Sequence, residues 1–155
     1  MPNLCECQLT IIGNNQKDEI KKFIKRAKID EVEPSDISIE KFLPTPKELD
    51  DTDTETENSE FIKKYGASNW YDWRVMNWGT KWDIIGGERT SEDDEDEKID
   101  YMFETAWSPP IEALQSISKL YPKFVFVLKY EETLTGFIGI AKFINGKVDN
   151  KVINY

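Results

Sequence analysis

"SPPIEALQSISKLYPKFVFVLKY", residues 108–130, predicts a helix that leads directly into a strand. Ser108 and Pro109 predict the helix start, with serine as the cap and proline at the first helical position. Pro122 ends the helix, and residues 123–130 are then almost continuously apolar, which is typical of a central strand covered on at least one face. The helix gains one buried face from apolar residues at helical spacing, namely Ile111, Leu114, Ile117 and Tyr121.

The N-terminal part of the chain predicts two strands with a helix between them. Residues 4–12 alternate apolar and polar side chains, as a half-buried strand does, and Gly13 closes the strand. Residues 16–28 have the period of an amphipathic helix whose outer face is rich in lysine. Residues 37–43 predict a second, short strand, which the prolines after it stop because proline cannot donate to a β-ladder.

The remaining periodic segments decide the fold class. Residues 80–88 and 98–106 predict two strands, and "GFIGIAKF" after the central strand predicts another, followed by a tight type I′ turn at Asn145 and Gly146. Helices between the strands of one hairpin-rich sheet indicate an α+β fold. We therefore expect a ferredoxin-like sandwich with a mostly antiparallel sheet, helices on one face, a Trp-rich helical insert, and a single domain over residues 1–155.

The insert contains "NWYDWRVMNWGTKWD", residues 69–83, with four of the five tryptophans. Asn69 predicts a helix cap and Gly79 the helix end. Two interpretations stay open: Trp73, Trp78 and Trp82 pack inward and fix the insert to the sheet, or one or two indoles stay exposed as a recognition patch, because Trp, Tyr and Arg dominate interface hot spots. The candidate partner-binding residues of this stretch are Trp70, Tyr71, Arg74, Asn77, Lys81 and Asp83.

The formal charge of −10 is concentrated in two acidic loops, at about 50–60 and 91–97. Residues 50–60 and 92–97 hold 12 of the 30 acidic residues and no Lys or Arg, so 18 acids stand against 20 bases elsewhere. Such runs either form solvated loops or engage a basic partner. For the second interpretation we add Asp93, Asp94, Glu95 and Asp96 to the candidate partner-binding residues.

Several kinds of chemistry are excluded by composition. The chain has no histidine, so that no Ser-His or Cys-His nucleophile can form. Cys5 and Cys7 are predicted to be small buried core residues, because a zinc site needs further soft ligands. We predict no catalytic residue, no metal site and no cofactor.

The quoted segments have a family likeness. "MPNLCECQLTIIG", "FLPTPKEL", "YGASNWYDWRVMNWGTKWD", "TAWSPP" and "YPKFVFVLKYEE" followed by "GFIG" resemble the YubB-like family of ferredoxin-like domains, small proteins of phages, plasmids and other mobile elements. The family usually has tryptophan where Leu4 stands and asparagine where Cys7 stands. The resemblance implies the ferredoxin-like fold and an origin on a mobile element, and it implies no reaction and no catalytic residue.

These features favour a non-enzymatic binding protein of a phage or plasmid. Its partner would be a host or mobile-element protein with a basic surface, for example a nucleic-acid-binding nuclease inhibited in the manner of an anti-CRISPR protein. The N-terminus lacks the features of a signal peptide and no apolar run could span a membrane, so we expect the cytoplasm of a bacterial host. The oligomeric state stays open.

Two alternatives belong to other classes. A single-stranded nucleic-acid binder would stack bases on strand aromatics, although the net charge opposes phosphate binding; its candidates are Tyr101, Phe103, Phe124, Phe126 and Tyr130. An enzyme or small-molecule binder would need a pocket lined by carboxylates; its candidates are Tyr71, Asp72, Asp83, Glu131 and Glu132.

Overall fold

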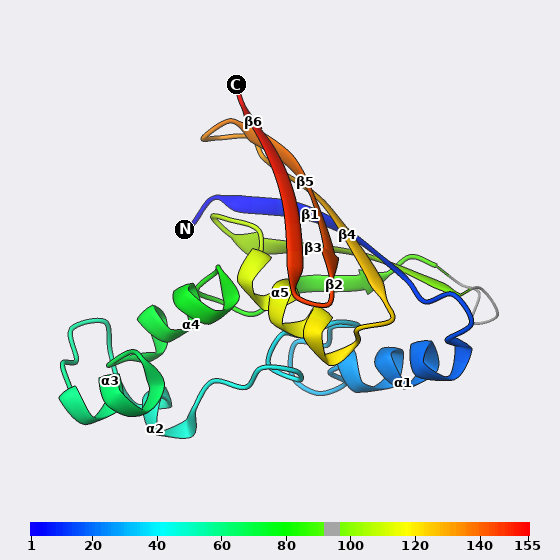
Figure 1. Ribbon diagram of the computed structural model, residues 1–155. Coiled ribbons are helices and arrows are strands. Elements are labelled where there is room, and N and C mark those ends of the chain that lie inside the picture. The colour runs from blue at the N-terminus through cyan, green and yellow to red at the C-terminus, as the bar shows by residue number, and fades with distance from the viewer. Residues whose placement is uncertain (92–96) are drawn as a thin grey trace.

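The computed structural model describes residues 1–91 and 97–155, and its centre is one antiparallel sheet (Figure 1). The strands lie in the order β2-β3-β1-β4-β5-β6, and every pair of neighbours is antiparallel. The chain therefore has the α+β, ferredoxin-like architecture that the sequence predicts. The strands are β1 (Leu4–Ile12), β2 (Ile85–Arg89), β3 (Lys98–Ala106), β4 (Val125–Glu132), β5 (Phe137–Ile144) and β6 (Lys147–Asn154).

The helices are divided between one face of the sheet and an insert. Helices α1 (Lys17–Ala27) and α5 (Ile111–Leu120) cover the same face, whereas α2 (Lys47–Asp50), α3 (Ser59–Tyr65) and α4 (Trp70–Trp78) form the insert beside them (Figure 1). Helix α4 lies against α5, which joins the insert to the main body. Among the described residues no helix is long and apolar enough to cross a membrane.

The core fills the space between the sheet and helices α1 and α5. Alternate residues of β1 point into it, because successive side chains of a strand face opposite sides. Phe23 of α1 stacks on Phe42 at a ring distance of 4.9 Å and meets Tyr121 edge-on at 5.1 Å. Cys5 and Cys7 are buried and free, as predicted.

Residues 37–43 do not form the predicted strand; they form turns over the core. The segment is apolar because Ile37, Ile39 and Phe42 are buried, not because it joins the sheet. Its backbone N–H groups find other acceptors: the N–H of Ile39 donates to the Asp83 carboxylate at 2.7 Å, and that of Phe42 to the carbonyl of Ile39 at 2.9 Å. A strand and a set of turns can both bury apolar side chains and satisfy their backbone groups. The apolar pattern of residues 37–43 therefore could not distinguish a strand from turns.

Two boundaries also differ from prediction. The strand expected from Thr80 begins only at Ile85, where pairing with β3 starts. Helix α5 begins at Ile111, and Ser108 does not cap it, because its hydroxyl donates to the carbonyl of Gly79 at 2.6 Å. The turn at Asn145 and Gly146 is confirmed by their φ angles of 47° and 81°, and β6 follows it.

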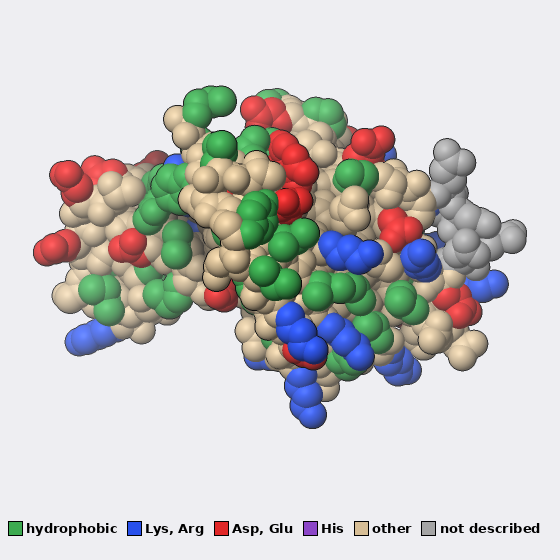
Figure 2. Space-filling model, turned by 90° about the horizontal axis from the view of Figure 1, so that it is seen from above, with side chains coloured by type: hydrophobic (Ala, Val, Ile, Leu, Met, Phe, Trp, Pro, Cys, Tyr) green, Lys and Arg blue, Asp and Glu red, His purple; other side chains and the backbone are tan. Residues whose placement is uncertain are grey.

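None of the helices that the structure describes lies on the face of the sheet opposite α1 and α5 (Figure 1). The strands toward the β6 edge are turned steeply relative to β2 and β3, which reflects the twist of antiparallel strands (Figure 1). Figure 2 views the molecule from the helix-free side and shows hydrophobic side chains gathered over the sheet, with acidic and basic side chains among them. We call this surface the open face.

Candidate functional site

Helix α4 positions the Trp-rich stretch, and its two ends are built as predicted. The Asn69 side chain accepts a hydrogen bond from the N–H of Asp72 at 2.8 Å, which satisfies one of the free donors of the first turn. Gly79 ends the helix with φ of 80°, a left-handed conformation that glycine adopts at little cost. A Cβ at Gly79 would also collide with the Glu112 carboxylate, so α4 and α5 approach closely here.

Trp78 fixes the insert to the rest of the molecule. It is fully buried, and its indole N–H donates to the carbonyl of Leu43 at 3.0 Å. Trp73 meets it edge-on at 6.0 Å, and Ile39 and Ala113 complete a small second core. The inward prediction is confirmed for Trp78, and the half-buried Trp73 packs on the same cluster.

Arg74 is half-buried and makes its contacts within the insert. Its guanidinium carbon is 5.1 Å from the Trp70 ring and 4.8 Å from the Trp78 ring, within the range of a cation–π interaction. Its Nε donates to the hydroxyl of Thr45 at 3.0 Å. Trp70 is half-buried beside it and meets the Tyr71 ring edge-on at 5.8 Å.

Two further candidates hold local structure together. The Asn77 side chain donates to the carbonyl of Trp73 at 2.9 Å, within the same helix. The Asp83 carboxylate accepts from the Ser38 hydroxyl at 2.6 Å and from the N–H groups of Ile39 and Ile84, each at 2.7 Å. Asp83 therefore organises the turns at residues 37–43.

Lys81 lies between two exposed indoles. Its ammonium nitrogen is 4.4 Å from the centre of the Trp82 ring and 4.1 Å from that of the Trp107 ring. Trp82 is 39% exposed and Trp107 45% exposed, so the inward prediction is wrong for Trp82. We call Lys81, Trp82 and Trp107 the indole clamp.

Trp107 is the residue of the indole clamp that the sequence did not single out. It follows β3 with φ of 66°, an uncommon conformation for a residue other than glycine, and its N–H donates to the carbonyl of Asn3 at 2.8 Å. The chain turns at Trp107, so that its indole meets Lys81 from a distant part of the sequence. No periodicity predicts such a turn.

The first acidic loop is held by local hydrogen bonds. The Asp53 carboxylate accepts from the N–H of Glu55 at 2.9 Å and from the Thr56 hydroxyl at 3.1 Å. Glu48 and Lys64 form an ion pair of 2.7 Å between α2 and α3, and this contact lowers the pKa of Glu48. The candidates Asp93, Asp94, Glu95 and Asp96 lie outside the described residues.

The strand aromatics are not available for stacking on nucleic-acid bases. Tyr101, Phe103 and Tyr130 are buried on the helix-covered face, as are Phe124 and Phe126. Burial also raises the pKa of the Tyr101 hydroxyl. The expectation that these five residues offer a stacking surface is therefore wrong, because helices α1 and α5 cover that face.

The carboxylates proposed for a small-molecule pocket are engaged at separate places. Asp72 is exposed at the first turn of α4, Asp83 binds the turns at residues 37–43, and Glu132 accepts from the N–H groups of Leu134 and Thr135 in the β4–β5 turn. In the described part of the chain no three carboxylate or thiol groups are placed to hold a metal ion. The Cys7 thiol has a raised pKa, through its contact with Cys5 and its burial.

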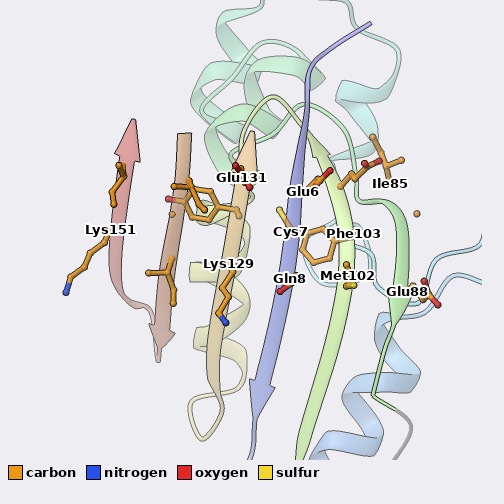
Figure 3. Close-up of a pocket in the computed structure, with 17 residues that line it drawn as sticks. Glu6, Cys7, Gln8, Ile85, Glu88, Met102, Phe103, Lys129, Glu131 and Lys151 are labelled. Atoms are coloured by element: carbon orange, nitrogen blue, oxygen red, sulfur yellow. The ribbon is translucent and has the colours of Figure 1, made fainter. Parts of the chain in front are cut away.

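A groove of about 1000 Å³ lies on the open face (Figure 3). Its charged lining residues are Glu6, Glu88, Glu104, Glu131, Lys129 and Lys151, and its aliphatic ones include Ile85, Ile138, Ile140 and Ile153. We call this surface the sheet groove. Alternation in residues 4–12 places Glu6 on the face of its strand opposite the apolar residues, but the register that brings the lining residues together is a property of the fold.

The chain is similar to one protein family and to one solved structure. Residues 77–154, half of the chain, match a family model described as the ferredoxin-like domain in Api92-like protein. The crystal structure of a protein api92 from Yersinia pseudotuberculosis is similar, with a TM-score of 0.56 and 9% sequence identity over 100% of this chain and 98% of that chain. No curated protein matches. The structural likeness concerns the fold alone, and neither description names a reaction or a ligand.

Proposed function

The chain belongs to the family of ferredoxin-like domains in Api92-like proteins, and we propose that it is a non-enzymatic binding protein that docks on another protein through the indole clamp. The observation that carries the proposal is the placement of Lys81 between Trp82 and Trp107, both more than one-third exposed. Tryptophan is rare at the surface and common at the centre of protein interfaces.

The indole clamp suits docking because its rings are held before a partner arrives. A cation–π contact on each ring fixes the orientation of both indoles, so less conformational entropy is lost on binding. The remaining candidates support this surface from within: Arg74 donates to the carbonyl of Lys81 at 3.4 Å, which ties α4 to the segment that carries the clamp. Trp70, Tyr71 and Asn77 lie on the same helix as Arg74.

The proposal also includes the origin of the protein and the type of partner that it binds. The resemblance to YubB-like proteins of phages and plasmids supports an origin on a mobile element. The charge of −10 supports a partner with a basic surface, such as a host nuclease that binds nucleic acid, because opposite charges steer association and suppress wrong partners. Inhibition of a host defence protein in the bacterial cytoplasm fits these properties.

The test is affinity capture from a bacterial host lysate, followed by calorimetry with the purified partner. The W82A/W107A variant removes both indoles, and we expect at least about a tenfold weaker affinity, since hot-spot truncations cost about 2 kcal/mol or more. The matched control is L134A, which truncates a hydrophobic side chain that is also exposed but lies in the β4–β5 turn. Unchanged affinity of W82A/W107A would refute docking through the clamp.

A further inference from the structure

Three glutamates stand in one row across the open face. In the sheet register Glu6 of β1 is opposite Glu104 of β3 on one side and Glu131 of β4 on the other. All three line the sheet groove, and Figure 3 shows Glu6 and Glu131 toward the same end of neighbouring strands. Neighbouring strands are about 4.8 Å apart, so the backbone positions of the three glutamates span about 10 Å.

This row has little internal compensation. Like charges directly opposite each other on neighbouring strands destabilise a sheet. Within residues 1–91 and 97–155 no ion pair reaches any of the three carboxylates; Glu131 accepts a hydrogen bond of 2.6 Å from the hydroxyl of Tyr155, which brings no positive charge. The fold therefore tolerates a local repulsion that a cation from outside would relieve.

Aliphatic side chains border the row at both ends. Ile85 of β2 is opposite Glu104, and at the other end Ile138 of β5, opposite Glu131, is paired with Ile153 of β6. Ile138 is 44% exposed and Ile153 68% exposed. A cationic ligand that fits this groove must therefore also carry apolar groups on either side, which a hydrated metal ion does not.

In the next row of residues, the charge of the groove lining changes from negative near β2 to positive near β6. This row contains Glu88, Met102, Gln8, Lys129, Ile140 and Lys151, so basic groups lie beyond the glutamate row toward the β6 edge. The lining as a whole has four glutamates against two lysines. The net negative charge favours a basic occupant over an acidic one.

We propose that the sheet groove binds a basic segment of a partner protein, with an arginine side chain over Glu6, Glu104 and Glu131 and aliphatic neighbours over Ile138 and Ile153. A guanidinium offers five N–H donors in one plane and can bind more than one carboxylate at once, which a lysine ammonium does less well. The proposal rests on the proposed function as a protein-binding module and adds the chemistry of the partner.

The test uses fluorescein-labelled peptides of twelve residues, in which leucine alternates with arginine, with lysine or with glutamine. Fluorescence anisotropy at low salt should show the arginine peptide binding most tightly and the glutamine peptide not at all. The E6Q/E104Q/E131Q variant should bind the arginine peptide at least about tenfold more weakly. The same variant should unfold at a higher temperature, because the row no longer repels itself.

The matched control is E31Q/E33Q/E57Q. It removes three exposed carboxylates that do not line the sheet groove. It should retain the affinity of the original chain. Equal weakening in both variants would mean attraction by net charge alone and would overturn the proposal, as would no binding of the arginine peptide.

Two other occupants give different results. Self-association of the chain that disappears in E6Q/E104Q/E131Q would assign the groove to a second copy, and a single-stranded oligonucleotide that competes with the peptide would assign it to nucleic acid; either result overturns the proposal. The W82A/W107A variant should bind the peptide normally. Unchanged host capture by W82A/W107A, together with peptide binding that depends on Glu6, Glu104 and Glu131, would refute the clamp and leave the groove standing. Weaker host capture by W82A/W107A, together with no binding of the arginine peptide to the original chain, would refute the groove and leave the clamp standing.

Discussion

The indole N–H of Trp78 donates a 3.0 Å hydrogen bond to the backbone carbonyl of Leu43, across 35 residues of chain. This contact joins the C-terminal end of α4 to the loop that precedes α2. The indole is fully buried in a cluster with Ile39 and Ala113, against which Leu43, Trp73 and Ile84 also pack. The insert is therefore held by one side chain that is both its largest apolar anchor and its polar link to the turns.

Truncation of this anchor should destabilise the chain strongly. We expect W78A to lose about 3–5 kcal/mol in the free energy of unfolding, because a buried indole leaves a cavity and an unpaired carbonyl. Urea denaturation followed by circular dichroism measures the loss. The exposed Trp82 is the matched control, and W82A should change stability by less than about 1 kcal/mol. Similar losses in both variants would contradict the anchoring role.

Asp83 provides a second prediction, because three backbone N–H groups and one hydroxyl donate to its carboxylate. D83A leaves these donors without an acceptor and should cost about 2–4 kcal/mol, since hydrogen bonds to charged groups contribute about 1.5–3 kcal/mol each and their losses are not additive. Chemical denaturation checks the value. D72A, at an exposed carboxylate of α4, should cost less, and an equal cost would rule out a special role for Asp83.

The sequence could predict the strands of the sheet, but not the contacts that Trp78 and Asp83 make with residues distant in sequence. Alternation in β1 and β3 and the Asn145-Gly146 turn are local properties, so they predicted strands and a hairpin correctly. The segment 37–43 was mistaken for a strand because burial of Ile37 and Ile39 gives the same pattern in turns. Its real partner, Asp83, is more than 40 residues away, and no local period reports it.

In the candidate site, too, the contacts between residues close in sequence were predictable and those between distant residues were not. Arg74 and Lys81 were named from residue type, and their ring partners within the stretch lie close in sequence. The second ring of the indole clamp, Trp107, comes from the end of β3. The glutamate row likewise depends on the register among three strands, which only the folded sheet defines.

Glu132 should make stability depend on pH. Hydrogen bonds from the Thr135 hydroxyl and from the N–H groups of Thr135 and Leu134 hold the pKa of this carboxyl below its usual value of 4.5. A lowered folded-state pKa adds stability above the unfolded-state value and loses it as the pH falls through the folded-state value. Urea denaturation between pH 6 and about 3 should show a steeper fall for the original chain than for E132Q. E131Q, which changes the neighbouring carboxyl, is the control, and an equal slope in the original chain and E132Q would disprove the assignment.

Gly139 is required by a close approach between β5 and Tyr130. A Cβ at Gly139 would collide with the Tyr130 ring, whose hydroxyl donates to the Asn150 side chain of β6 at 2.6 Å. G139A should therefore cost about 1–3 kcal/mol, as overpacking does. The double variant G139A/Y130A relieves the collision, so its loss of stability should be smaller than the sum of the two single losses. Additive losses would show that the two residues do not compete for the same space.

The last prediction concerns Lys81, whose ammonium group orients the rings of Trp82 and Trp107. K81M keeps an unbranched side chain and removes the charge, so the rings lose a cation–π contact worth about 0.5–1 kcal/mol at an exposed site. We expect little change in the unfolding midpoint but greater quenching of indole fluorescence by acrylamide, because the rings become more mobile. K129M, on the open face, is the matched control and should leave the quenching unchanged. If K81M also left it unchanged, Lys81 would not hold the rings, and their preorganisation for a partner would need another cause.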